Sequence, residues 1–177
     1  IPPSGWEKVE AFCYPIRQAR NQAVRNSIQA LHAAGYPVSE ESVCALAGPN
    51  GDICKQYIMR RLIEAGLCTE YYGTLYQNLF KKQTDGTPGI AALCFAAADP
   101  EEAVRCVVDS DGKAVLAHPG QYDNFSELPC LVEAGLWGIE AYHPKHSDQH
   151  TARCFVLAET YGLAVTGGSD FHGRYGE

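Results

Sequence analysis

Apolar residues recur every three to four positions through the first half of the chain, which is the spacing of helices with one buried face. Glycine at positions 35 and 66 directly follows two of these stretches, as is typical where a helix ends in a left-handed residue. The pattern predicts four helices, over residues 17–34, 39–46, 53–65 and 70–82.

The second half has a different pattern, in which short apolar runs alternate with longer amphipathic stretches. A Gly- and Pro-containing segment at 84–89 marks the change, and Asp99-Pro100 then has the form of a helix start, with Asp as the N-cap and Pro in the first turn. Alternating strands and helices of this length are typical of parallel βαβ units. We expect neighbouring parallel strands over 113–118, 136–142 and 163–168, with crossover helices over 126–134 and 147–161.

Composition and charge exclude several classes of protein. The 177 residues are 46% hydrophobic and 20% charged, which is a globular composition. No apolar run approaches the roughly 20 residues that span a bilayer, so no membrane partner is expected. Lys plus Arg is 14 against 21 Asp plus Glu, and a net charge of −7 does not favour holding nucleic acid by bulk charge. A local, metal-centred site for a phosphate remains compatible with this charge.

Eight cysteines are spread along the chain without a C-x-x-C pair, which excludes a zinc ribbon and a thioredoxin-like motif. Most of them lie among apolar residues, so we expect free thiols in a reducing compartment and a cytoplasmic protein. The chain starts with Ile1 and shows no basic and apolar signal-peptide pattern there, so we expect no signal peptide. We also expect both ends to be cuts through a longer protein that has lost an N-terminal segment.

Each predicted strand runs into residues that can bind metal or transfer protons. His118 follows the first strand and His143 the second, and the third runs into Asp170 and His172. Functional sites of parallel α/β folds form where the carboxyl ends of the strands meet. Three successive strand ends that all carry histidine therefore indicate one site.

Each of these residues also has a structural alternative. His118 is either a ligand or a core histidine bonded to a backbone carbonyl. Asp170 and His172 point the same way on an extended segment and suit Zn, Mn or Fe, or they form a polar turn. Glu140 is either a buried acid with a partner or an acid at the strand edge. His143 and His146 either bind substrate or cap a loop.

Three sequence motifs resemble the last motifs of the polymerase and histidinol phosphatase (PHP) family. They are AHPG at 117–120, GIEAYHPKH at 138–146 and TGGSDFHG at 166–173. The closest resemblance is to the bacterial branch of nucleoside bisphosphate phosphatases and exonucleases that act on short RNA. The resemblance implies part of a distorted (β/α)₇ barrel with a helical insertion: residues 1–15 as a barrel remnant or linker, 16–88 as the insertion, and 89–177 as the C-terminal βαβαβ part.

The same resemblance implies the chemistry. The family binds up to three divalent metals, here Mn, Zn or Fe, and His118, Asp170 and His172 match metal ligands. We expect His143 or His146 to act in catalysis by orienting phosphate or protonating the leaving oxygen. Glu140, Lys145 and Arg174 are candidates for supporting the ligands or contacting the substrate. The family's N-terminal His-x-His motif is absent from this sequence. In the insertion, Lys55 and Tyr57 replace an Arg and a His of relatives.

The function implied is metal-dependent hydrolysis of the phosphate esters of nucleotides or short RNA, with the 177-residue chain itself expected to be metal-poor and inactive. Two alternatives stay open. One is a non-catalytic remnant of a PHP protein, and the other is a metal-dependent amidohydrolase or deaminase.

Overall fold

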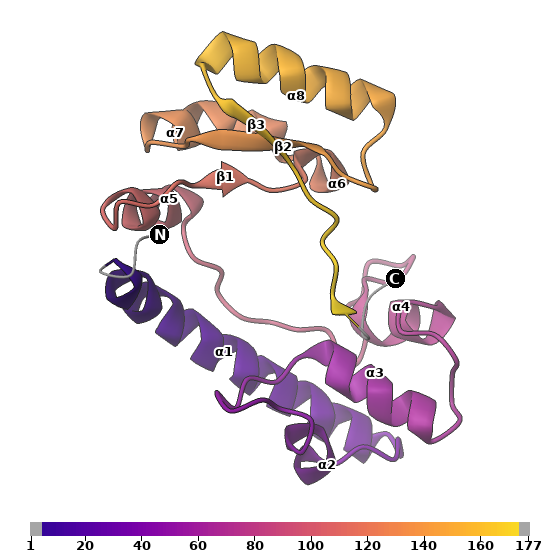
Figure 1. The fold of residues 1–177 in the computed structure, drawn as a ribbon. Coiled ribbons are helices and arrows are strands. Elements are labelled where there is room, and N and C mark those ends of the chain that lie inside the picture. The colour runs from indigo at the N-terminus through magenta and orange to yellow at the C-terminus, as the bar shows by residue number, and fades with distance from the viewer. Residues whose placement is uncertain (1–4, 174–177) are drawn as a thin grey trace. The chain divides into compact units, whose positions relative to one another are not determined.

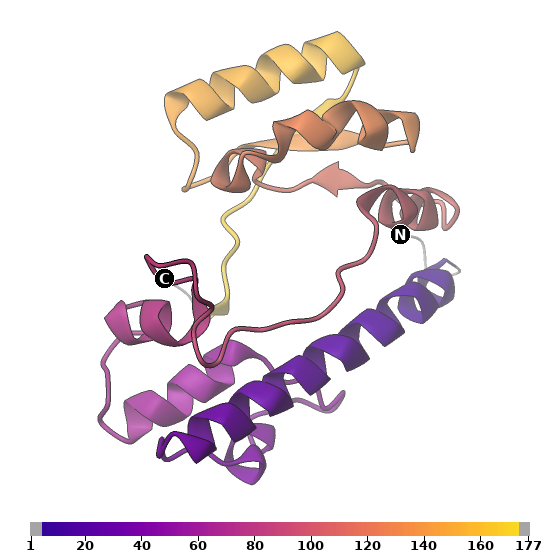
Figure 2. The same cartoon turned by 180° about the vertical axis from the view of Figure 1, so that it is seen from behind.

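The computed structural model describes residues 5–173, and the chain divides into two compact units (Figures 1 and 2). Unit 1 comprises Ile1–Cys13 and Ala98–Phe171, and unit 2 comprises Tyr14–Ala97 and His172–Glu177. The first division falls inside a helix, so that helix contributes residues to both units. Each unit has its own hydrophobic core, as expected of parts that bury their own apolar faces.

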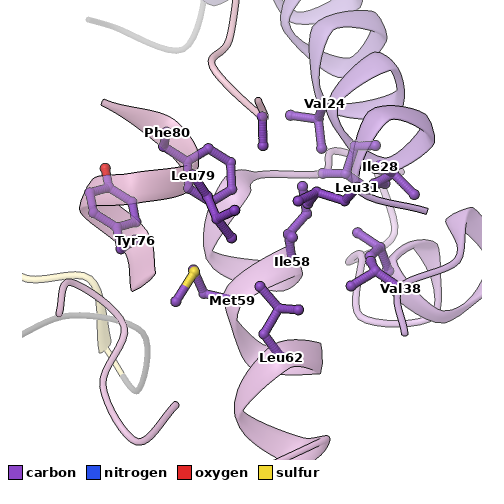
Figure 3. Close-up of a cluster of buried hydrophobic side chains, with 13 residues drawn as sticks. Val24, Ile28, Leu31, Val38, Ile58, Met59, Leu62, Tyr76, Leu79 and Phe80 are labelled. Atoms are coloured by element: carbon purple, nitrogen blue, oxygen red, sulfur yellow. The ribbon is translucent and has the colours of Figure 1, made fainter. Parts of the chain in front are cut away.

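Unit 2 is helical. Its elements are most of α1 (Trp6–Ala33), α2 (Glu40–Cys44), α3 (Lys55–Glu64) and α4 (Thr74–Phe80). Figure 3 shows that the apolar faces of these helices meet in one core. Leu31 from α1 and Ile58, Met59 and Leu62 from α3 are completely buried there. All four helices expected in the first half of the chain are therefore present, although three of them are shorter than the pattern predicts.

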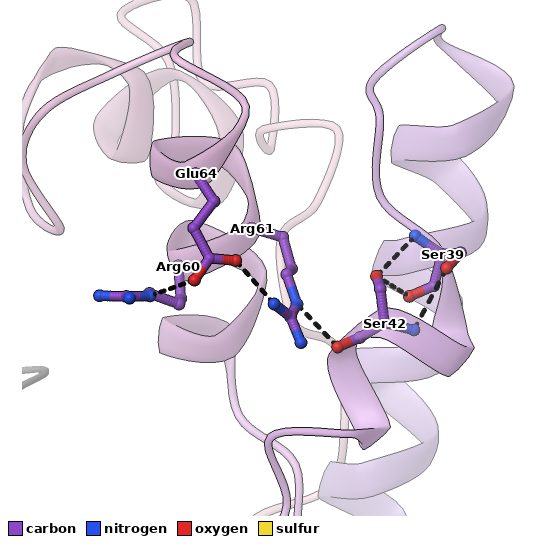
Figure 4. A network of polar contacts seen from close by, with 5 residues as sticks. All are labelled: Ser39, Ser42, Arg60, Arg61 and Glu64. Carbon is purple, nitrogen blue, oxygen red and sulfur yellow. Dashed lines mark hydrogen bonds and ion pairs between the residues drawn. The ribbon is translucent and has the colours of Figure 1, made fainter.

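A polar network joins the two short helices α2 and α3 (Figure 4). Ser39 caps α2 in a capping box with Ser42. The Arg61 guanidinium of α3 donates a hydrogen bond to the backbone carbonyl of Ser42 (2.7 Å). Within α3, the Glu64 carboxylate accepts hydrogen bonds from both Arg60 and Arg61 (2.6 Å each). The carbonyls at the end of a short helix lack partners within it, and Arg61 satisfies one of them.

Helix α1 begins eleven residues before the predicted start at residue 17, so the expected boundary is wrong there. The helix passes through Pro15, which cannot donate a backbone hydrogen bond and therefore signalled a boundary. Contacts outside the helix hold its first turns: Lys8 Nζ donates to the carbonyl of Asp109 (2.9 Å), and Cys106 Sγ lies 3.8 Å from the carbonyl of Lys8.

Unit 1 combines a three-stranded sheet with helices. Its elements after the start of α1 are α5 (Pro100–Val108), β1 (Val115–Leu116), α6 (Pro119–Tyr122), the 3₁₀ helix η1 (Asn124–Glu127), α7 (Leu128–Glu133), β2 (Gly138–Tyr142), α8 (Asp148–Tyr161) and β3 (Ala164–Gly167). The strand order is β1-β2-β3, and both pairs are parallel. Neighbouring parallel strands in the expected segments are thus confirmed, with α7 and α8 in the connections between them.

Local capping sets several of these boundaries. Asp99 accepts from the backbone N–H groups of Glu101 and Glu102, with Pro100 in the first turn as expected. Ser147 caps α8, and Gly162 ends it with φ of 65°. Such short-range bonds depend only on nearby residues, which explains why the sequence located these helix ends well.

The core of unit 1 lies on one face of the sheet. Ile139 and Ala141 are completely buried and share a face of β2, because side chains alternate along a strand. They pack with α7 residues and with Cys154 and Ala158 of α8, so α7 and α8 cover this face. Glu140 points to the opposite face, where it is paired in register with Thr166 of β3.

The architecture is therefore α/β with a small parallel sheet. All eight cysteines are free, as expected. Within residues 5–173 no helix is both long enough and apolar enough to cross a membrane. The division at 15/16 and 88/89, and the assignment of its parts to an insertion and a barrel, stay predictions.

Candidate functional site at the strand ends

The end of β1 carries a backbone conformation that is unusual for its residue type. His118 has φ of 31° and ψ of 54°, in the left-handed region that costs a non-glycine residue roughly 1–2 kcal/mol. Its backbone N–H donates to Glu140 Oε2 on the neighbouring strand (2.9 Å). Glu140 is therefore a half-buried acid with a partner, which decides between the two alternatives for this residue.

Glu140 also occupies the space beside β3. A Cβ atom built on Gly168 would overlap Glu140 Oε1, so only glycine leaves room for the carboxylate in this position. Gly168 is itself held by a hydrogen bond from its N–H to the carbonyl of Tyr142 (3.0 Å). The carboxylate thus reaches from β2 to the ends of both neighbouring strands.

We expect Gly168→Ala to displace the Glu140 carboxylate and free the His118 amide. The loss of one hydrogen bond to a charged acceptor corresponds to about 1.5 kcal/mol, or roughly tenfold faster hydrogen exchange at the His118 amide. Global stability should change much less, because the clashing atom is the end of a flexible side chain. Gly48→Ala is a matched control, since an added Cβ there meets nothing within 4 Å. Unchanged exchange at His118 in Gly168→Ala would contradict this role of the glycine.

The imidazoles of His118 and His143 lie next to each other. Their ring centroids are 5.0 Å apart, and His143 is only 9% exposed. His143 Nδ1 accepts the backbone N–H of Lys145 (3.1 Å), while His143 Nε2 and His118 Nδ1 are buried with no hydrogen-bond partner among residues 5–173. A buried polar atom without a partner is costly, so these two nitrogens are the atoms of the strand ends best suited to a ligand.

His146 uses both of its ring nitrogens on the backbone. Nε2 accepts the N–H of Gly120 (3.0 Å), and Nδ1 lies 2.8 Å from the carbonyl of Ala141. The ring lies between His143 and His150, with centroids 5.7 and 5.8 Å away. His146 therefore links the loop after β1 to the end of β2.

The remaining predicted site residues are exposed or lie outside the described residues. Asp170 is exposed, with φ of 51°, and lies in unit 1, whereas exposed His172 is counted with unit 2. Lys145 is exposed, and Arg174 lies outside the described residues. Residues 5–173 contain no group of three or more His, Cys, Asp or Glu side chains arranged to hold a metal. The convergence of His118, Asp170 and His172 on one metal cluster stays a prediction.

Unit 2 has a pocket of about 530 Å³ with cationic walls. Arg20 of α1, Lys55 and Gln56 at the start of α3, and His172 contribute its polar lining. The Arg20 Nε atom is buried, and none of the described residues offers it a hydrogen bond. Two fixed cations beside a helix N-terminus suit an anionic group.

The start of α3 is held against α1 by a buried amide. Asn21 Oδ1 accepts the backbone N–H of Ile53 (3.1 Å), and its Nδ2 donates to Asp52 (3.2 Å). Cys54, the N-cap of α3, also lines the pocket. Burial raises the pKa of the Cys54 thiol, so it is protonated and unreactive at neutral pH.

The sequence did not identify two of these contributors. Arg20 is one of several arginines on α1, and nothing in the spacing distinguishes it. His150 lies in the first turn of α8, and it is partly buried beside Phe125, with ring centroids 6.3 Å apart. Its position three residues after Ser147 was the available signal, because that spacing is typical of a capping box.

Comparisons with known proteins give close relatives, although no family model matches. The chain is 40% identical over 172 residues to a phosphoribosyl 1,2-cyclic phosphate 1,2-diphosphodiesterase of Eggerthella lenta, covering 97% of this chain and 64% of that protein. It is 29% identical to a 3′,5′-nucleoside bisphosphate phosphatase of Chromobacterium violaceum (89% and 55%). It is also 29% identical to the 5′-3′ exoribonuclease Rnm of Salmonella typhimurium (88% and 52%).

Two solved structures share the fold. A protein described as a candidate metal-dependent phosphoesterase from Bifidobacterium adolescentis aligns with a TM-score of 0.82 at 22% identity, over 98% of this chain and 60% of that one. A Chromobacterium violaceum protein described as an amidohydrolase, with bound sulfate and no metal, aligns with a TM-score of 0.77 at 25% identity, over 95% and 59%. The chain spans 52–64% of the length of the curated relatives it matches. The comparisons thus confirm the resemblance to the PHP family of metal-dependent phosphoesterases that the sequence motifs indicated.

Proposed function

We propose that this chain is part of an enzyme that hydrolyses phosphate esters of nucleotides or short oligonucleotides with the help of divalent metal ions. The observation that carries the proposal is the buried pair of partnerless nitrogens, His118 Nδ1 and His143 Nε2, at the ends of parallel strands. Its relatives supply the class of substrate, since they include a nucleotide phosphatase and an exoribonuclease.

The residues present fit a metal only in part. His118 offers a buried nitrogen without a partner, and the carboxylate of Asp170 and the imidazole of His172 are suitable ligand types. Metal ions, when bound, lower the pKa of water to give hydroxide and neutralise the phosphoryl oxygens. In this proposal His118, Asp170 and His172 are three of the ligands, and further ligands come from residues beyond these 177.

His143 is placed to act on the substrate itself. Its Nδ1 accepts a backbone N–H, so in the neutral ring the proton lies on Nε2, which is buried and has no partner. An Nε2–H in this position can donate a hydrogen bond to a phosphate oxygen, whereas transferring it to the leaving oxygen would leave the ring with no proton on either nitrogen. Lys145 and Arg174 would add positive charge near the substrate.

The cationic pocket of unit 2 is the proposed site for an anionic part of the substrate. Arg20 and Lys55 supply charge, and the ammonium of Lys55 is held 5.1 Å from the ring centroid of Tyr76. The similar C. violaceum structure contains bound sulfate, which has the shape and charge type of a phosphate. The eight free cysteines are compatible with a reducing compartment, and we place the protein in the cytoplasm.

Phosphate release is the decisive test. We expect a longer chain, extended at its N-terminus with the segment that its relatives carry, to release phosphate from a 3′,5′-nucleoside bisphosphate when Mn, Zn or Fe is added, and the 177-residue chain to show little turnover. Ammonia released from an aminonucleotide without phosphate would support the deaminase alternative instead. Neither product, together with no metal retained by the longer chain on dialysis, would support a non-catalytic PHP protein.

A further inference from the structure

We propose that Glu140 and His146 are positioning residues that together hold the backbone of residues 118–120, and that His146 does so as a neutral imidazole rather than as a proton donor. The inference rests on the function proposed above and assigns two roles within it. It differs from the expectation from the sequence that His146 acts as a catalytic residue.

The contacts of His146 leave it no free proton to give. Nε2 accepts the Gly120 N–H and so carries no hydrogen, which places the single ring proton on Nδ1, facing the carbonyl of Ala141. Protonating Nε2 would set two N–H groups against each other. The two backbone contacts therefore favour the neutral tautomer of His146 that carries its proton on Nδ1.

Glu140 and His146 act on the same three-residue segment from two sides. Glu140 accepts the N–H of His118, and His146 accepts the N–H of Gly120 two residues later. Gly120 also lies against the His150 ring, where an added Cβ would come within 2.6 Å of it. Residues 118–120, which lead from the end of β1 into the first turn of α6, are thus bonded at both ends and packed against an imidazole ring.

This restraint fixes the backbone conformation and the ring orientation of His118. A left-handed histidine is held at an energetic cost, and it persists only where the surroundings impose it. The two side-chain bonds supply that constraint and direct the imidazole toward His143, with centroids 5.0 Å apart. Groups that orient a metal-binding histidine typically contribute 10- to 100-fold to metal affinity or activity.

The first test needs no activity and uses the 177-residue chain. Long-range ¹H–¹⁵N NMR of the imidazoles should show His146 with its proton on Nδ1 and Nε2 shifted as a hydrogen-bond acceptor. In His146→Ala, the Gly120 amide should exchange about tenfold faster, as expected for a lost bond of about 1.4 kcal/mol. An Nε2-protonated or doubly protonated His146 at neutral pH would overturn the proposal.

The second test separates positioning from proton donation in the longer, phosphate-releasing chain. His146→Gln retains one donor and one acceptor on a planar group but cannot donate a catalytic proton, whereas His146→Ala loses both. We expect alanine to lower kcat by about 10- to 100-fold and glutamine to restore most of that loss. Equal losses in both variants would assign His146 to proton donation and refute positioning.

Two variants test Glu140 in the same way. Glu140→Gln keeps an acceptor for the His118 N–H, and Glu140→Ala removes it. His32→Ala is the control, because this exposed residue near the end of α1 belongs to unit 2 and lies outside the pocket. If the longer chain releases no phosphate at all, the proposed function fails, while the NMR of the 177-residue chain still decides the positioning roles.

Discussion

Replacing Asp170 by asparagine is expected to reduce phosphate release by the longer chain by more than about a hundredfold. Losing a group that merely supports a metal ligand already costs about 10- to 100-fold, so losing a ligand should cost at least as much. Asparagine is a better substitution than alanine for this test, because Asp170 has φ of 51° and asparagine tolerates that conformation. The variant removes the charge and keeps the backbone preference. The measurements are kcat and the metal content of the purified protein.

Asp111 provides a matched control for this experiment. It is also an aspartate with positive φ, 53°, and it lies in the turn after α5. Asp111→Asn should leave turnover unchanged, so any general effect of this substitution in left-handed backbone is measured separately. Circular dichroism of both variants should match that of the unmodified chain, since Asp170 is exposed and carries little of the core. Near-normal activity of Asp170→Asn would remove this residue from the metal site.

Replacing Leu31 by alanine is expected to have the largest effect on stability. Leu31 is completely buried in the helical core of unit 2. Truncation of a buried leucine costs about 2–5 kcal/mol, because transfer free energy is lost and a cavity remains. That is a large part of the total stability of an ordinary domain. Urea unfolding followed by helical circular dichroism would measure the shift of the midpoint.

Leu67 serves as the control for size and residue type. It is 48% exposed, just after α3, so Leu67→Ala should change the free energy of unfolding by about 0.5 kcal/mol or less. The two clusters of buried residues belong to different units. If the unfolding curve shows a second transition that Leu31→Ala does not shift, that transition is the unfolding of unit 1. Equal destabilisation by the two substitutions would show that Leu31 is not part of a tightly packed core.

The elements were predictable wherever their signals are local. Asp99-Pro100 starts α5, Ser39 caps α2 and Gly162 ends α8, each through bonds or conformations that involve only nearby residues. The parallel sheet was predictable for a similar reason, because short apolar runs separated by helices permit few other topologies. The start of α1 was not, since the helix continues through Pro15 where local rules predict a boundary.

The candidate site was predictable in its composition and not in its connections. Histidine after each strand indicated where chemistry would gather, and the structure brings His118 and His143 together there. The bonds from the backbone of residues 118 and 120 to Glu140 and His146 join residues 22 and 26 positions apart. No periodicity or spacing rule encodes such bonds, because they depend on how the loops meet after the strands have paired.

The sequence by itself determined the order of the elements, the parallel α/β class and the residue types at the strand ends. Local propensity, capping and hydrophobic period act over a few residues, so they can be followed along the chain. Only the tertiary structure decided which nitrogen of each histidine is occupied and which is left without a partner. Those assignments depend on side chains and backbone groups from different elements, and the same histidine can be a ligand, a proton donor or a link between loops according to what packing places around it.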